Sequence, residues 1–292
     1  MSPAPGFLEE GGFLAGKRAS IEDFDVAAFD LDGTLLSRDL RLSRASVEAL
    51  EALRERGMRV IVATGRRFEG AVEYVERLGF REEDPIICFG GAMIRRLSGE
   101  TLLHRTVPRD LSAEVVEWAR ERGIHSRIFA DGRVIASPET PAALAHLRTF
   151  YEPDVVVRDN LSWLCSKEAE DPTKLVLVDY PDEIEGWLPE AREAFAGRLF
   201  VTRSLPHYVE IGGLEGRKSL ALEFMCGLWG VDPARTLAFG DAENDMDLLE
   251  FAGCGVAMGN ARPHVRAVAD DVAPPIDEDG VARYIERLLG AG

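Results

Sequence analysis

From residue 25 onward, short apolar runs alternate with segments whose apolar residues recur at helical spacing. Buried strands are predicted at residues 25–29, 59–63 and 85–89, and a helix is predicted at 43–56. This alternation indicates a parallel sheet with helices on both faces, the doubly wound, Rossmann-like α/β architecture. In such sheets ligands bind beyond the carboxyl ends of the strands, so the residues that follow each strand are the first candidates for function.

The alternation changes character after about residue 91 and returns near residue 207. Between these points, helices are predicted near 111–122 and 141–151, and strands near 127–129, 154–158, 174–178 and 198–202. We therefore expect a discontinuous core of residues 25–90 and 207–292, with an α/β cap domain, residues 91–206, inserted in it. Residues 1–24 are expected to form an N-terminal extension.

The first predicted strand runs directly into Phe29-Asp30-Leu31-Asp32-Gly33-Thr34. In an extended segment, residues i and i+2 point the same way, so the carboxylates of Asp30 and Asp32 can approach one site. Two buried carboxylates are costly unless a cation or a proton lies between them, and Mg²⁺ prefers hard oxygen ligands. Most Asp-x-Asp pairs are surface acids, but the position of this one directly after an apolar strand makes it a candidate metal site.

A second polar segment, Thr64-Gly65-Arg66, follows the second predicted strand and begins a helix. Hydroxyl and backbone N–H groups at a helix N-terminus suit phosphate oxygens, although Thr64 could equally be an ordinary N-cap. Lys218 opens another predicted helix after a glycine-bearing loop, and by itself it would be a surface lysine. These two segments indicate a functional site only in combination with the acidic segments.

The last polar segment, Phe239-Gly240-Asp241-Ala242-Glu243-Asn244-Asp245, lies at the end of another apolar run. Its carboxylates and its amide are predicted to lie at the same sheet edge as Asp30. An acidic loop that caps a helix would explain Asn244 or Asp245 alone. Four such segments at strand ends or helix starts of one chain indicate a single site instead.

The composition excludes several classes of function. The formal charge of −17 argues against nucleic acid, which needs a basic face, and it means that an anionic substrate requires local cations or a metal ion. The four cysteines include no Cys-x-x-Cys pair, which is typical of free thiols in a reducing compartment. No apolar run has the length of a signal peptide or the ~20 residues of a membrane span, so we expect a cytoplasmic protein that does not bind membranes.

The order Asp-x-Asp-Gly-Thr, Thr-Gly-Arg, Lys and Gly-Asp-x-x-Asn-Asp resembles the haloacid dehalogenase (HAD) superfamily, and more narrowly its Cof-type, class IIB phosphatases. In that branch a large α/β cap is inserted between the second and third motifs. The resemblance extends from about residue 25 to 289 and includes His207-Tyr208-Val209-Glu210-Ile211, Val256-Ala257-Met258-Gly259-Asn260-Ala261 and Asp279-Gly280-Val281. The chain departs from the usual pattern at Gly90-Gly91-Ala92, where the branch has Asn-Gly-Ala, and at Ser219, where it has glycine.

This resemblance implies a role for each candidate residue. Asp30 would be the nucleophile that forms an aspartyl-phosphate, and Asp32 would be the general acid and base. The implied cofactor is Mg²⁺, bound by Asp30, Asp241 and the backbone carbonyl of Asp32, and by Asp245 directly or through water. The groups implied to bind the phosphate belong to Thr64, Gly65, Lys218 and Asn244.

The implied function is that of a Mg²⁺-dependent phosphatase of small phosphorylated metabolites, such as sugar phosphates. A sugar phosphomutase shares the four motifs and a similar cap, but it would yield an isomerised sugar phosphate rather than free phosphate. A signalling receiver module also combines acids, a hydroxyl and a lysine, but it would need an aspartate after the strand at 85–89. The substrate and the oligomeric state stay open; a monomer is slightly favoured over a dimer, because a large cap can shield the site without a partner.

Overall fold

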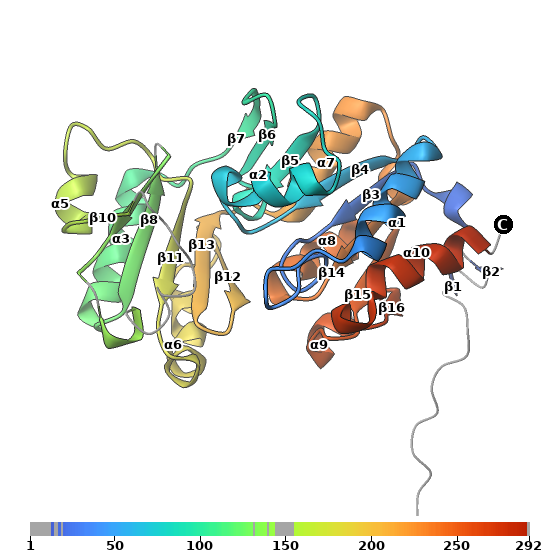
Figure 1. The fold of residues 1–292 in the computed structure, drawn as a ribbon. Helices are drawn as coiled ribbons and strands as arrows, with labels where there is room; N and C mark the ends of the chain where they lie inside the picture. Colours follow the sequence, from blue (N-terminus) through green and yellow to red (C-terminus); the bar gives the residue numbers. More distant parts are fainter. Residues whose placement is uncertain are drawn as a thin grey trace, which may run out of the picture.

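The computed structural model describes residues 13–14, 17–18, 20–130, 132–138, 140–143 and 155–290. Apart from a short hairpin of β1 (Phe13–Leu14) and β2 (Lys17–Arg18), the strands of these residues form two separate sheets (Figure 1). The larger sheet has eight strands and the smaller one six. Most of the helix predicted near 141–151 lies outside the described residues.

The eight-stranded sheet forms the core, in the order β16-β15-β14-β3-β4-β5-β6-β7. The first six strands in this order run parallel, and β6 and β7 are added antiparallel at one edge. Their bounds are β3 (Val26–Phe29), β4 (Arg59–Ala63), β5 (Pro85–Cys88), β6 (Met93–Arg96), β7 (Thr101–His104), β14 (Thr236–Gly240), β15 (Cys254–Met258) and β16 (Asp271–Ala273). The central strands are apolar and buried throughout, as strands covered on both faces must be.

Helices cover both faces of this sheet, as the alternation of the sequence predicts. One face carries α1 (Arg44–Glu55), α2 (Phe68–Arg77) and α10 (Gly280–Gly290), and the other carries α7 (Lys218–Trp229), α8 (Met246–Phe251) and α9 (Pro263–Arg266). Successive side chains of β3 divide between the two: Ala27 and Phe29 pack in the first layer, Val26 and Ala28 in the second. The doubly wound α/β core is thereby confirmed.

The six-stranded sheet forms the cap, in the order β10-β9-β8-β11-β13-β12. Its strands are β8 (His125–Ala130), β9 (Arg133–Ala136), β10 (Val155–Val157), β11 (Lys174–Val178), β12 (Leu199–Leu205) and β13 (Tyr208–Gly213). Three helices, α3 (Arg109–Glu121), α5 (Asn160–Leu164) and α6 (Pro181–Ala194), pack on one face around a separate hydrophobic core. In Figure 1 the cap lies to the left of the core. The face of its sheet that does not carry these helices faces the core.

The sheets divide the chain at other places than the boundaries predicted at 90/91 and 206/207. Strands β6 and β7 follow the first boundary, yet they extend the core sheet as a hairpin. Strand β13 follows the second, yet it pairs with β12 and β11 of the cap. Short turns join each of these strands to its neighbour. In the sequence, a strand that continues the same sheet after a short turn looks the same as the first strand of a new domain, so the boundary cannot be located from the sequence pattern.

The predicted N-terminal extension also ends earlier than residue 24. Ile21 and Phe24 are buried in the hydrophobic layer that α1 and α10 share, so this part of the segment belongs to the core. Short 3₁₀ helices complete the fold: η1 (Ile21–Asp23), η2 (Phe89–Gly91), η3 (Pro233–Arg235), η4 (Glu243–Asp245) and η5 (Ile276–Glu278). In the described part of the chain, no helix combines the length and the apolar character that crossing a bilayer requires.

Candidate active site

Asp30 is the first residue after β3. Its backbone N–H donates to the carbonyl of Phe239 on the neighbouring strand β14 (2.9 Å), which extends the ladder by one residue. Its carboxylate is buried, and its Oδ1 accepts a hydrogen bond from Lys218 Nζ (2.5 Å). Because Lys218 is the first residue of α7, the start of that helix brings an ammonium group to the carboxyl edge of the sheet.

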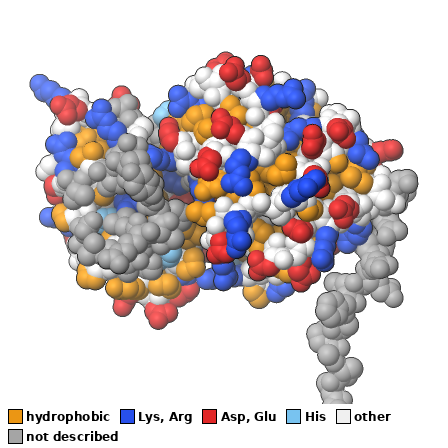
Figure 2. Space-filling view, viewed as in Figure 1, with side chains coloured by type: hydrophobic (Ala, Val, Ile, Leu, Met, Phe, Trp, Pro, Cys, Tyr) orange, Lys and Arg blue, Asp and Glu red, His pale blue; other side chains and the backbone are white. Residues whose placement is uncertain are grey.

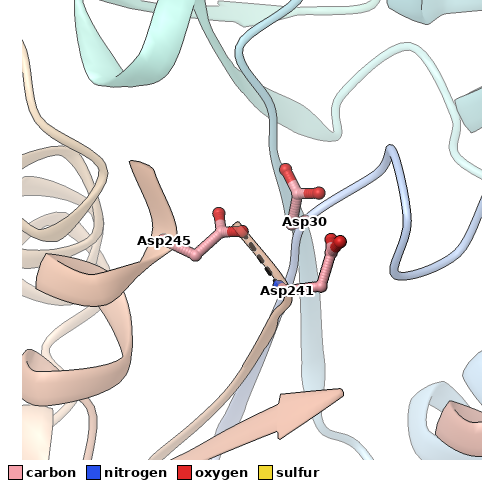
Figure 3. Close-up of side chains that lie close together, drawn as sticks. All are labelled: Asp30, Asp241 and Asp245. Atoms are coloured by element: carbon pink, nitrogen blue, oxygen red, sulfur yellow. Dashed lines mark hydrogen bonds between the residues drawn. The ribbon is translucent and has the colours of Figure 1, made fainter. Parts of the chain in front are cut away.

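Asp241 and Asp245 complete a cluster of three carboxylates around Asp30 (Figure 3). One oxygen atom from each lies within 4.8 Å of the others. The Oδ2 atom of Asp245 accepts the N–H of Asp241 (3.0 Å), and its Oδ1 accepts from Lys218 Nζ (2.5 Å). Thr34, the end of the first motif, donates its hydroxyl to Asp241 Oδ1 (3.2 Å). The first, third and fourth motifs therefore meet at one point.

Burial and repulsion between carboxylates raise the pKa values of Asp30 and Asp241. The pKa of Asp30 lies well above its usual value, because the carboxyl is buried and faces Asp245. The same two causes raise the pKa of Asp241 to about 7. Burial lowers the pKa of Lys218, but the carboxylates of Asp245 and Asp30 outweigh it and hold that pKa above its usual value. One ammonium group thus compensates only part of the charge of three acids.

The donor set of this cluster fits a hard divalent cation. Octahedral Mg²⁺ binds oxygen at about 2.1 Å, which separates its ligand oxygens by roughly 3–4 Å. Three carboxylate oxygens within 4.8 Å come close to this geometry, and a cation among them would remove the repulsion that raises the pKa values. Asp30, Asp241 and Asp245 could therefore hold a metal ion, as the sequence predicts, whereas the side chain of Asp32 is not part of the cluster.

Asp32 points instead to the second motif. Both of its oxygens are paired with the Arg66 guanidinium, at 2.7 Å from Nε and 2.6 Å from Nη2. Arg66 is itself fixed by the carbonyl of Gly70 (3.1 Å) and by the ring of Tyr74, 4.8 Å from its guanidinium carbon. A bidentate pair of this kind sets the direction of the carboxylate as well as its charge. Asp32 nevertheless lines the same cavity as Asp30.

The candidates for phosphate binding surround the same edge of the sheet. Thr64 follows β4 and is fully buried, and its Oγ1 accepts the N–H of Arg66 (3.1 Å). Gly65 and Asn244 line the cavity together with Asp30. A Cβ atom built on Gly65 would lie 3.5 Å from Asn244 Nδ2, so the second and fourth motifs are neighbours. Thr64 itself, like Lys218, lies behind the residues that line the cavity.

The cavity has a volume of about 650 Å³ and lies between the cap sheet and the core. The core side contributes Asp30, Asp32, Gly65, Arg66 and Asn244 of the motifs and the first turns of α2. The cap side contributes side chains of four neighbouring strands: Arg127, Phe129, Lys174, Val176, Ser204, Leu205, Tyr208 and Glu210. Over the face drawn in Figure 2, the described acidic and basic side chains are interspersed, which differs from the continuous basic surface of nucleic-acid-binding proteins.

Two residues of the cap, Lys174 and Glu210, contact the second motif, and their role is not predicted from the sequence. Lys174 Nζ donates to the carbonyl of Gly65 (2.6 Å) and pairs with Glu210 (2.9 Å). Glu210 stands in a segment of family resemblance, but strand alternation alone would make it an outward-facing acid. The only signal in the sequence is a pair of opposite charges on two predicted strands of the cap. Whether the two side chains meet depends on the pairing register of β11 and β13, which the sequence does not show.

A profile of the haloacid dehalogenase-like hydrolases matches residues 27–285, nearly the whole described chain. The curated 5-amino-6-(5-phospho-D-ribitylamino)uracil phosphatase YitU of Bacillus subtilis is 27% identical over 271 residues, which cover 90% of this chain and 97% of that protein. The structure of a haloacid dehalogenase-like hydrolase from B. subtilis is 25% identical, with a TM-score of 0.79 and coverage of 90% of this chain and 99% of the other. A subclass IIB sugar phosphatase, 22% identical with a TM-score of 0.76 and coverage of 90% and 98%, shares the fold.

A discontinuous α/β core with an acidic cluster at its carboxyl edge, covered by an inserted cap, defines a hydrolase of this class, and the chain belongs to the haloacid dehalogenase-like family. Within that family it is a phosphatase, as its motifs predict and as curated relatives such as YitU bear out.

Proposed function

We propose that this protein is a Mg²⁺-dependent phosphatase that hydrolyses small phosphomonoesters through an aspartyl-phosphate on Asp30. The observation that carries the proposal is the junction of Asp30, Asp241, Asp245 and Lys218 beside a cavity that the cap closes on its far side. A nucleophilic carboxylate, a set of metal ligands and a cation for the phosphoryl oxygens are the parts that phosphoryl transfer needs.

In the first step, an oxygen of Asp30 attacks phosphorus and the ester P–O bond breaks. Asp32 gives a proton to the oxygen of the leaving group, and Lys218, Thr64 and Asn244 hold the phosphoryl group. In the second step, Asp32 takes a proton from water, whose oxygen attacks phosphorus, and the bond between phosphorus and Asp30 breaks to release inorganic phosphate. A Mg²⁺ ion bound by Asp30, Asp241 and Asp245, and by the backbone carbonyl of Asp32, would neutralise charge on the phosphoryl oxygens.

Arg66 prepares Asp32 for this role. The bidentate pair aims the carboxylate along the wall of the cavity, and one of its oxygens has to exchange the guanidinium for the leaving group before a proton can move. Arg66 is held in place by Gly70 and Tyr74, so the exchange requires a motion of Asp32 alone.

The cavity supports a substrate of the size of a sugar phosphate or a similar phosphomonoester. A volume of about 650 Å³ exceeds what a phosphate group needs, and its cap wall offers charged, hydroxyl-bearing and aromatic side chains to a polar leaving group. The name of the relative YitU describes a phosphate carried on a ribityl chain, which is a leaving group of this kind. All four cysteines are free thiols, which supports work in the cytoplasm on such metabolites, and the shielded site favours a monomer.

The decisive experiment is the substitution Asp30→Asn, which keeps the shape of the side chain and removes the nucleophile. We expect loss of Mg²⁺-dependent phosphate release from p-nitrophenyl phosphate, while the exposed Asp39→Asn, a matched control in the same loop, keeps the wild-type rate. Near wild-type activity of Asp30→Asn would falsify the proposal. Sugar phosphates that yield an isomer without free phosphate would favour a phosphomutase instead.

A further inference from the structure

The peptide group between Gly65 and Arg66 links the cap to the hydroxyl of Thr64. Its carbonyl accepts a hydrogen bond from Lys174 Nζ on β11 of the cap (2.6 Å). Its N–H donates to Thr64 Oγ1 (3.1 Å). Because a peptide group is planar, the direction of the carbonyl fixes that of the N–H at its other end. A cap side chain thus sets the orientation of the N–H group that the Thr64 hydroxyl oxygen accepts.

The ammonium group of Lys174 is itself held firmly. Glu210 accepts from it at 2.9 Å, and the two side chains are only 6% and 13% exposed. The rings of Phe89 and Phe129 lie with their centroids 5.8 and 5.7 Å from Nζ, one from the core and one from the cap. A buried ion pair with such surroundings cannot shift without leaving a charge unpaired.

The glycine at position 65 is what admits this arrangement. A Cβ atom there would lie 3.0 Å from Glu210 Oε1, which is closer than carbon and oxygen normally approach. A larger residue would require the Glu210 carboxylate, which pairs with Lys174, to shift. The backbone at Gly65 and the ion pair of the cap are therefore fitted to each other.

We propose that Lys174 is a positioning residue of the phosphatase, which acts through the Gly65–Arg66 peptide group to orient the Thr64 hydroxyl toward the phosphate. With its oxygen accepting the N–H of Arg66, the hydroxyl keeps its own proton to donate to a phosphoryl oxygen. The Thr64 hydroxyl has this orientation only while β11 packs against the core, because Lys174 lies on β11. Seating of the cap, to which the leaving group binds, is thereby coupled to the assembly of the phosphate site.

This inference rests on the proposed function, in which Thr64 binds the phosphate, and a double-mutant cycle separates the two. We would measure the Ki of inorganic phosphate against hydrolysis of p-nitrophenyl phosphate for wild type, Thr64→Val, Lys174→Met and the double variant. Loss of the Thr64 hydroxyl is expected to raise Ki about tenfold, the effect of one hydrogen bond to a charged group. Lys174→Met is expected to raise it roughly fivefold, and less than twofold when Thr64 is already valine.

Two further variants keep the test sharp. Lys174→Met with Glu210→Gln removes the acid that Lys174→Met leaves unpaired, so we expect the double variant to be more stable than Lys174→Met and to show the same coupling to Thr64. Val178→Ala, buried on the same face of β11, lowers the melting temperature of the cap but leaves the Ki of phosphate unchanged.

The outcomes are distinct. Effects of Lys174 and Thr64 that multiply independently would overturn the inference and leave the phosphatase proposal standing. An unchanged Ki in Thr64→Val would remove the role of that hydroxyl, and the inference with it, although Asp30 could still be the nucleophile. A Ki in Val178→Ala that rises as in Lys174→Met would reduce Lys174 to a general contribution to cap stability.

Discussion

Replacement of Lys218 by methionine tests the electrostatic balance of the site directly. The ammonium group donates to Asp30 Oδ1 and to Asp245 Oδ1, both at 2.5 Å, and the three side chains are at most 6% exposed. Methionine keeps the length and removes the charge, so two buried carboxylates lose their common partner. Removing one member of a buried ion pair typically costs 3–5 kcal/mol, as an order of magnitude. For a domain of this size that corresponds to a fall of roughly 6–20 °C in melting temperature.

The effect of Lys218→Met depends on whether a metal ion is available. A divalent cation among Asp30, Asp241 and Asp245 takes over the role of counter-ion, so Mg²⁺ is expected to raise the melting temperature of the variant more than that of the wild type. The measurement is thermal unfolding in EDTA and in a Mg²⁺ titration, with the exposed Lys167→Met as the matched control. A metal-free Lys218→Met protein as stable as the wild type would refute the reasoning, because the acids would then not need the ammonium group.

Two more predictions follow from the same site. Asp241 binds its proton more tightly in the folded protein (pKa about 7) than in the unfolded chain (3.8), so metal-free stability should fall as pH rises through this window. The loss, up to about 4 kcal/mol by urea unfolding, should shrink in saturating Mg²⁺, which displaces the proton; a pH-independent stability in EDTA would contradict it. Gly91→Ala should cost more than about 3 kcal/mol, because φ is +108° and a Cβ would lie 2.2 Å from the backbone of Arg217, directly before Lys218. Gly57→Ala, also at positive φ but with open space around it, is its control and should cost about 1 kcal/mol.

The core and its motifs could be predicted because their signals are local. A short apolar run such as β3 or β14, bounded by polar residues, favours a buried strand, and parallel strands bring the residues after them to one edge. That reasoning places Asp30 and Asp241 correctly without any knowledge of their contacts. It also finds Lys218, whose position at a helix start is visible in the glycine-rich segment before it.

The rest depends on pairing between distant strands, which local patterns do not encode. Strand β13 could belong to either sheet until its partners β11 and β12 are known. Lys174 and Glu210 lie on the same face only because those two strands pair in one register, and a shift of one strand by one residue would turn its side chain to the helix-covered face and break the pair. The cap boundaries and the contacts of Lys174 could therefore not be predicted from the sequence, because both depend on which distant strands pair and in which register.

The paired charges of the site predict a linkage between metal and phosphate. Five carboxylates, Asp30, Asp32, Asp241, Asp245 and Glu210, pair or cluster with three cations, Arg66, Lys174 and Lys218, which leaves two negative charges to oppose a phosphate dianion at a pH at which all five acids are ionised. A divalent cation in the cluster cancels them. Phosphate should therefore bind at least about tenfold more tightly in saturating Mg²⁺ than in EDTA, and phosphate should strengthen Mg²⁺ binding by the same factor, because coupling between two ligands is reciprocal.

Calorimetric titration of each ligand with and without the other measures all four sides of this cycle. Sodium chloride at the ionic strength of the magnesium salt is the control, since general screening would also weaken repulsion between charges. Asp245→Asn lowers the negative charge by one while Asp30 and Asp241 remain, so in this variant the metal-free affinity for phosphate should rise and the coupling should become smaller. A phosphate affinity that sodium raises as much as magnesium does would mean that the cluster acts only as a diffuse field, and that its three carboxylates are not arranged for an ion.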